Sequence, residues 1–148
     1  MKLSPTAHEE RGAAVIEGAL ILLAFFTVFF AIWEAGRLMN VQQCVTNGAR
    51  EGARFAVTPL TQTSCLPTDT AIRARVNTFL QAASINGATI DINSGSGIGT
   101  PTVINGKQYT RVRVTYDYSF LSIPLLNGLT ATVHGEALMK NEALYACP

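Results

Sequence analysis

One apolar segment, from Ala13 to Trp33, constrains this chain more than any other feature of its sequence. Its length and composition fit a membrane-spanning helix, which needs roughly 20 apolar residues. The only ionisable side chain inside the segment is Glu17. A carboxylate in such a span is costly, on the order of a few kcal/mol, and for that reason Glu17 is a candidate functional residue.

Two explanations for Glu17 stay open at this point. In the first, the chain is cut after Gly12, and Ala13 becomes a new N-terminus that carries an ammonium group. Glu17 lies four residues further on, so the two groups share one face of a helix. Each charge is less costly in hydrocarbon when the two are paired, within one subunit or between neighbours. In the second, Glu17 lies near the membrane edge and its side chain reaches water.

The sequence around this position follows a recognisable pattern. A short polar leader ends in Gly12, and Glu17 would be the fifth residue of the mature chain, which resembles the processing site of type IV pilins and pseudopilins. The longer pattern consists of RGAAVIEGAL over residues 11–20, the apolar helix, and TNGAREGAR over residues 46–54. It resembles the TadE-like family, the pilin-like minor components of tight-adherence (Flp-type) pilus systems.

The resemblance implies a role and a set of partners. A prepilin peptidase would cut between Gly12 and Ala13, and Glu17 would be the carboxylate used in assembly. The partners would be other pilin or pseudopilin subunits, in a homo- or hetero-oligomer, and the inner-membrane assembly machinery; no cofactor is implied. Gly18 departs from the family pattern, in which an aromatic or larger residue commonly follows the Glu. The major subunit of such systems is usually much shorter, which favours a minor role.

The length and the net charge limit which folds and functions the rest of the chain can have. A chain of 148 residues has room for an anchor and one small globular domain. The net charge of +1 argues against nucleic-acid binding, which usually requires a clustered basic excess. We predict a leader over residues 1–12, a transmembrane and assembly helix over 13–35, and an extracytoplasmic pilin-like domain over 36–148.

The charge bias does not decide the orientation, because basic residues flank the span on both sides. The predicted location is the bacterial inner membrane, single-pass with the C-terminal domain outside the cytoplasm, and a surface pilus after assembly. This prediction rests on the family resemblance and on the cysteines.

The first helix is predicted to continue beyond the membrane, over residues 36–57. Apolar and small residues recur there at three- and four-residue steps. Gly48 and Gly52 have Gly-x-x-x-Gly spacing, and Ala49 and Ala53 repeat it one position later. Small residues at this spacing permit close helix packing. Packing against the domain's own sheet and packing against another subunit are both compatible with the pattern.

The remaining sequence predicts an α+β fold. A second helix is expected over residues 69–84, with Thr68 or Asp69 as its cap. An antiparallel sheet is expected over residues 88–141, where Asn105-Gly106 is a type I′ hairpin signal and two long segments alternate apolar and polar residues.

Three cysteines occur, and their spacing does not support a zinc site. Outside the cytoplasm, one disulfide with one cysteine left over is the simplest arrangement. We favour Cys65 with Cys147, since both lie in loop-like sequence, and expect Cys44 to be buried in the helix. The pairing of Cys44 with Cys147 stays open.

No catalytic motif is present, and the chain is not expected to be an enzyme. The Gly-rich run over residues 95–99 lacks the strand–loop–helix context of a dinucleotide site. His134 with Asp117 and Ser119 or Ser122 would resemble a triad, but no nucleophile motif supports it. The main alternative to a pilus subunit is a membrane-anchored extracytoplasmic binding module that does not polymerise.

Overall fold

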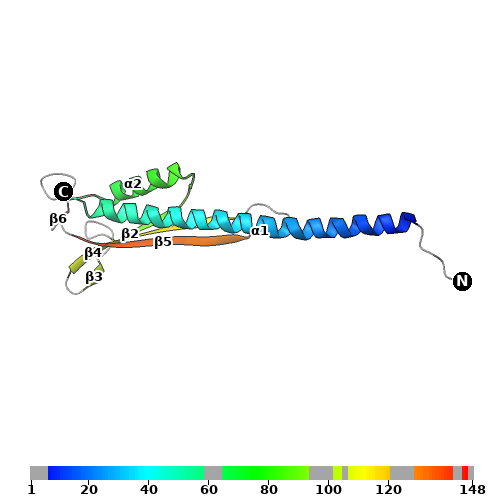
Figure 1. Ribbon diagram of the computed structural model, residues 1–148. Helices are drawn as coiled ribbons and strands as arrows, with labels where there is room; N and C mark the ends of the chain where they lie inside the picture. Colours follow the sequence, from blue (N-terminus) through cyan, green and yellow to red (C-terminus); the bar gives the residue numbers. More distant parts are fainter. Residues whose placement is uncertain are drawn as a thin grey trace. The chain divides into compact units, whose positions relative to one another are not determined.

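The structure is a computed structural model that describes residues 7–58, 65–93, 102–104, 107–120, 129–141 and 145–146. The chain divides into two compact units, Met1–Arg37 and Leu38–Pro148. Helix α1 (Ala7–Ala56) contributes residues to both units (Figure 1). It therefore begins before the expected start near Ala13 and includes the second half of the predicted leader.

The helix ends in the second unit are set by local hydrogen bonds. After α1, the Thr58 hydroxyl donates to the Arg54 carbonyl at 2.7 Å. Helix α2 (Asp69–Ala82) is shorter than the predicted 69–84 at its C-terminal end, and the Thr68 side chain caps its N-terminus. At its C-terminal end, Ser84 has a φ of 60° and the Ile85 amide bonds to the Leu80 carbonyl at 2.9 Å. This is the Schellman arrangement, which satisfies the last carbonyls of a helix.

The main sheet of the second unit is antiparallel and centred on β4 (Lys107–Ser119). Strand β5 (Thr130–Lys140) pairs with β4 from residue 109 to residue 119. The short strands β2 (Thr89–Asn93) and β3 (Thr102–Ile104) pair with β4 at residues 111–115 and 107–109. Because β5 occupies one edge of β4 over this length, β2 and β3 follow one another along the other edge.

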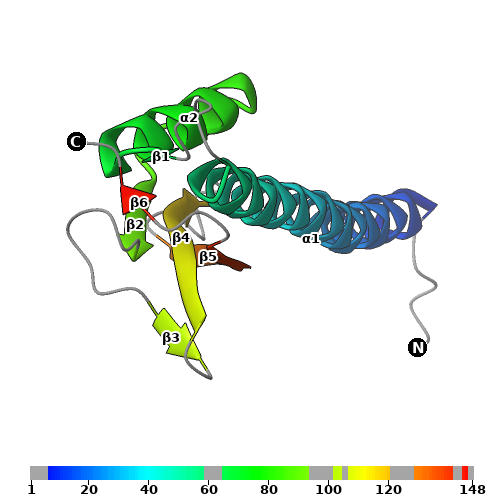
Figure 2. The same ribbon diagram turned by 90° about the vertical axis from the view of Figure 1, so that its left-hand side faces the viewer.

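Both helices of the second unit lie over the same face of this sheet. In Figure 2, α2 lies above β2, and the C-terminal end of α1 lies above β4 and β5. The predicted alternation is confirmed, because residues 112, 114 and 118 of β4 and residues 133 and 135 of β5 are buried. The helices and the sheet enclose the core, which consists of Val45, Ala49, Ala53, Ala56, Ile72, Val76, Leu80, Ile85, Ile90, Ile92, Val112, Val114, Tyr118 and Val133.

Helix α1 lies close to β5 at Gly135. A Cβ atom added to Gly135 would lie 2.6 Å from the Cα of Thr46 and 2.9 Å from the carbonyl carbon of Val45. Beside this contact, the Gln42 side-chain amide donates a hydrogen bond to the His134 carbonyl at 2.9 Å. The glycine thus lets the helix backbone rest on the strand, and Gln42 satisfies a carbonyl of a strand that has only β4 as a neighbour in the described sheet.

One sequence prediction needs correction, and another lies outside the described residues. The segment at Cys65 was predicted as a loop, yet β1 (Cys65–Leu66) pairs in parallel with β6 (Tyr145–Ala146). Two-residue strands carry no periodic signal, so only the tertiary fold reveals them. The hairpin strands around residues 105–106 are paired as expected. The turn itself lies outside the described residues.

Candidate functional site

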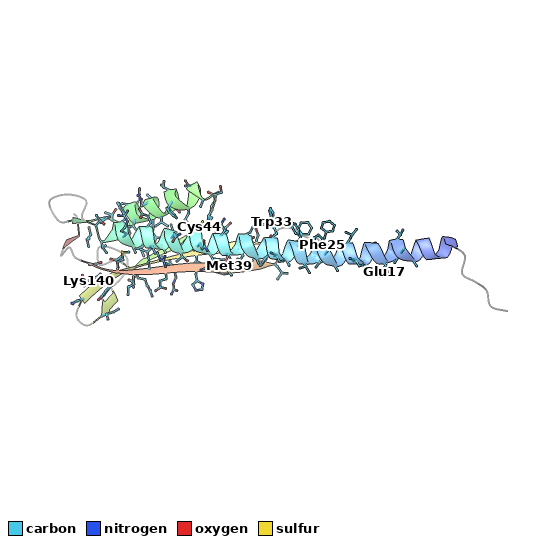
Figure 3. All side chains as sticks on the ribbon, in the orientation of Figure 1. Glu17, Phe25, Trp33, Met39, Cys44 and Lys140 are labelled. Carbon is cyan, nitrogen blue, oxygen red and sulfur yellow. The ribbon has the colours of Figure 1, made fainter. Side chains whose placement is uncertain are left out.

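The part of α1 that follows Gly12 in the first unit exposes apolar side chains on every face (Figure 3). By length and composition it is able to cross a membrane. A helix that is apolar all round is either buried in a large protein or placed in lipid, and this one is exposed. The exposed large apolar residues before residue 34 are Val15, Ile16, Leu20, Ile21, Leu22, Leu23, Phe25, Phe26, Val28, Phe29, Phe30, Ile32 and Trp33.

Two polar groups in or next to this segment already have partners. The Thr27 hydroxyl donates to the Leu23 carbonyl at 2.8 Å, which satisfies the hydroxyl within the helix. Glu34 is buried and forms an ion pair with Arg37 at 3.1 Å, one helical turn further along. These contacts remove two costs that lipid would otherwise impose on polar groups.

Glu17 differs from these groups. Its side chain is exposed and projects from the helix (Figure 3). Among the side chains that the structure describes, none forms a hydrogen bond or an ion pair with it. Ala13 lies one turn earlier on the same face of α1, as the spacing predicts. In hydrocarbon this carboxylate would therefore need a cation from elsewhere or a new amine at Ala13.

The predicted cleavage position, Gly12-Ala13, lies inside α1 and not at its end. Both residues are exposed. A Cβ atom added to Gly12 would meet nothing within 4 Å, and the same holds for Gly18. Neither glycine is needed for a close contact in the part of the chain that the structure describes.

The small residues of α1 belong to the second unit and pack inside it. Ala49 and Ala53 are fully buried in the core. A Cβ atom on Gly48 would lie 3.0 Å from Leu80, and one on Gly52 would lie 2.4 Å from Val76, both residues of α2. The sequence left open whether these small residues pack within the domain or against another subunit. The described contacts lie within the domain, where the small residues pack against α2 and the sheet.

The cysteines fall into two groups. Cys44 is half-buried and not fully buried as expected. It is a free thiol that donates a hydrogen bond to the Asn40 side chain at 3.5 Å, which contradicts the alternative pairing of Cys44 with Cys147. The favoured pair is not tested, because Cys147 and the Cys65 side chain lie outside the described residues. The backbone of β1 and β6 pairs Leu66 with Ala146, the residue before Cys147.

The outer face of the sheet is a set of paired polar side chains. Arg111 and Arg113 both contact Glu136, at 3.8 and 2.6 Å. The Thr132 hydroxyl donates to Asp117 at 2.8 Å, whereas His134 lies opposite Thr115 in the register. The triad considered from sequence is therefore not assembled from Asp117 and His134. Within the described part of the chain, no cluster of residues suited to metal binding occurs.

Sequence reasoning missed a contact between the helices of the second unit. Glu51 accepts a hydrogen bond from Arg54 of its own helix at 3.0 Å. It also accepts from Arg75 of α2 at 2.8 Å. The hydrogen bond from Arg54, with that from Arg75, lowers the pKa of Glu51 below its ordinary value. The contact between Glu51 and Arg75 joins residues 24 positions apart, and such a contact leaves no spacing signal in the sequence. The close approach at Gly135 did leave a signal, since a glycine inside a strand often marks a close backbone approach.

The fold and the candidate site define the class of protein: an α+β chain with an N-terminal helix able to span a membrane and a carboxylate near the start of that span. The model of one family, TadE-like protein, matches residues 12–54. This match confirms the resemblance over the segment that contains Gly12, Glu17 and the small residues of α1. Searches of curated proteins and of solved structures gave no match. Together these findings fit a membrane-anchored protein related to the Tad pilus.

Proposed function

We propose that this chain is a pilin-like structural subunit, a minor pilin or pseudopilin, of a tight-adherence type IV pilus. The observation that carries the proposal is the position of Glu17. It is a carboxylate without a described partner, one turn after Gly12-Ala13, in an apolar helix whose TadE-like match begins at residue 12. A fixed anchor does not need a carboxylate at this position, whereas a subunit that is cut and assembled would use it.

In this proposal a prepilin peptidase hydrolyses the bond between Gly12 and Ala13. Water adds across the amide, which leaves a carboxylate on Gly12 of the leader and an ammonium group on Ala13. The new cation appears one helical turn from Glu17, so the pair neutralises charge within one subunit or between two. Removal of residues 1–12 also removes four charged side chains, Lys2, Glu9, Glu10 and Arg11, from the end of the span.

The proposed partners and location follow from the same role. The apolar surface of α1 before residue 34 would contact lipid in the bacterial inner membrane and the helices of other pilin or pseudopilin subunits after assembly. The second unit, with its own core, would lie outside the cytoplasm. Its size relative to the anchor favours a minor subunit that primes the filament or is incorporated into it.

The test has two measurements on the protein from native membranes and from the sheared surface fraction. First, we expect the intact mass and the N-terminal residue to correspond to a chain that begins at Ala13. Second, we expect Glu17→Leu to be cut normally but to be lost from the surface fraction.

Thr27→Val is the matched control, since it also removes a polar group from the span, but one already satisfied by Leu23. It should assemble like the unmodified chain. A chain that keeps Met1 in cells with an active prepilin peptidase, and that tolerates Glu17→Leu, would contradict the proposal. That outcome would favour the non-polymerising anchored binding module.

A further inference from the structure

The outer face of the sheet, on the side away from the helices, has an excess of positive charge at one end. Along β4, residues 107, 109, 111 and 113 point to this face, because residues 110, 112 and 114 are buried on the other. Lys140 of β5 lies directly opposite Tyr109 in the register and points the same way. Lys107 and Arg111 flank Tyr109 along β4, so three cations surround one tyrosine. We call Lys107, Tyr109, Arg111 and Lys140 the cationic cluster.

The nearby carboxylates do not neutralise the cationic cluster. Glu136 is bound by Arg113 at 2.6 Å and lies 3.8 Å from the arginine of the cluster. Asp91 lies opposite Arg113 in the register, and so it is not next to the lysines. Among the residues that the structure describes, Lys107 and Lys140 have no hydrogen-bond or ion-pair partner. Cations about 7 Å apart on a sheet face repel one another, so an anion bound here would relieve this repulsion.

The backbone beneath the cluster is held in place by two hydrogen bonds. Thr110 is fully buried, and its hydroxyl donates to the Asn141 side-chain oxygen at 2.6 Å. The Asn141 amide donates to the Gln108 carbonyl at 2.9 Å. Both bonds tie the end of β5 to the start of β4 next to the pair of Tyr109 and Lys140. The fold therefore sets the spacing of the ring and the cations before a ligand binds, which lowers the entropic cost of binding.

We propose that the cationic cluster binds an acidic polysaccharide, a polymer of sugars that carry carboxylates. The half-buried ring of Tyr109 offers a flat apolar surface to the C–H face of one sugar ring. The two ammonium groups and the guanidinium of Arg111 pair with the carboxylates of that sugar and its neighbours. Ile104 and Leu138 are exposed beside the cluster and contact further C–H groups of the polymer.

The side chains of this face favour a polysaccharide over other anionic polymers. Single-stranded nucleic acids are bound by several aromatic rings on which successive bases stack. Tyr109 is the only tyrosine, phenylalanine or tryptophan that the described strands place on the outer face. Acidic and phosphorylated peptide motifs are commonly bound by clusters of arginines, whereas two of the three cations here are lysines. A single ring between lysines fits one sugar with charged neighbours.

This inference goes beyond the proposed function, because it assigns a ligand to the second unit and does not depend on cleavage or assembly. The experiment measures binding of the full chain, in detergent micelles, to immobilised polygalacturonate at several salt concentrations. Dextran serves as a neutral polysaccharide, and single-stranded DNA and polyphosphate serve as the other anionic polymers. We expect binding to polygalacturonate that weakens with salt, no binding to dextran, and weaker binding to the two phosphate polymers.

Three variants separate the cluster from the overall charge of the chain. Lys140→Gln should weaken binding to polygalacturonate about three- to tenfold and reduce its salt dependence. Tyr109→Leu should weaken it about threefold and leave the salt dependence unchanged, because it removes only the ring. Arg50→Gln is the matched control: it also removes one exposed cation without a described partner, but from α1, and it should bind like the unmodified chain.

The outcomes are decisive once thermal unfolding shows that the variants are folded. Equal losses in Lys140→Gln and Arg50→Gln would overturn the inference, because binding would then follow net charge alone. Binding to DNA or polyphosphate as tight as to polygalacturonate would also overturn it and would indicate a phosphate ligand. Absence of binding to any of the polymers would do the same. The intact mass of the chain tests the proposed function separately, so the two can fail independently.

Discussion

At the scale of single residues, three glycines set how closely the elements of the second unit approach one another. Gly48 faces the end of the Leu80 side chain, Gly52 faces the branched Val76, and Gly135 faces the backbone of α1. The three contacts differ in what has to move if a methyl group is added. A leucine tip changes rotamer, a valine is stiff at its one torsion, and a helix backbone moves only as a whole.

Alanine at these positions should therefore give a graded loss of stability. We expect Gly48→Ala to change the unfolding free energy by less than about 1 kcal/mol, because the gain in helix propensity offsets the crowding. Gly52→Ala should cost about 1–3 kcal/mol, and Gly135→Ala at least as much as Gly52→Ala. Denaturant unfolding of the full chain in micelles measures the series. A Gly135→Ala variant as stable as Gly48→Ala would show that α1 does not rest on β5.

At the scale of elements, the two helices of the second unit are joined by a buried face and a polar clasp. The face consists of the small residues of α1 against α2. The clasp consists of the Glu51 carboxylate, which forms ion pairs with Arg54 of its own helix and with Arg75 of α2. The neighbouring Arg73 side chain also donates to the Ile90 carbonyl and so ties α2 to β2. The clasp is exposed, so it adds less than the buried face.

The clasp predicts a pH dependence with a defined sign. The pKa of Glu51 is lowered in the folded chain, first by the hydrogen bond from Arg54 and then by that from Arg75. The contribution of Glu51 to the free energy of unfolding is therefore complete above its pKa in the unfolded chain, about 4.3. This contribution is lost as the pH falls through the pKa of Glu51 in the folded chain. Glu51→Gln should lower Tm by a few degrees, on the order of an exposed ion pair, at pH 7.

The Tm difference between Glu51→Gln and the unmodified chain should shrink as the pH falls below the ordinary pKa of a glutamate, and it should disappear once the pH is below the lowered pKa of Glu51 in the folded chain. Thermal unfolding at a series of pH values measures this. Asp91→Asn is a suitable control, because it also removes an exposed carboxylate from the second unit but leaves the clasp intact. A difference that stays constant with pH would mean that the glutamine alters packing and not charge pairing.

At the scale of the whole molecule, the two units have surfaces suited to different surroundings. The first exposes apolar side chains around a helix, and the second encloses its apolar side chains between two helices and a sheet. The compartment of the second unit determines the state of its cysteines, because disulfides persist only outside the reducing cytoplasm. The parallel pairing of β1 with β6 brings the two ends of a long chain segment together.

We therefore predict a disulfide between Cys65 and Cys147 and a free thiol at Cys44. Closing so long a loop would contribute around 3–5 kcal/mol in the chain-entropy model. Protein taken from the membrane and denatured without reduction should bind one equivalent of alkylating reagent, and Cys44→Ser should bind none. Three reactive thiols before reduction would contradict both the disulfide and the placement of this unit outside the cytoplasm.

The sequence by itself determined the features that depend on neighbours along the chain. The apolar run with Glu17, the continuation of the first helix over about residues 36–57, a cap at Thr68 or Asp69 and the alternation of the two long strands all follow from short periods and local hydrogen bonds.

Only the tertiary structure decided which distant elements touch. Thr46 rests on Gly135, Glu51 binds Arg75, and β1 pairs with β6. It also decided that the small residues of α1 pack within their own domain. A pattern of small residues shows that a close approach is possible, and the partner is chosen by the packing of the whole core.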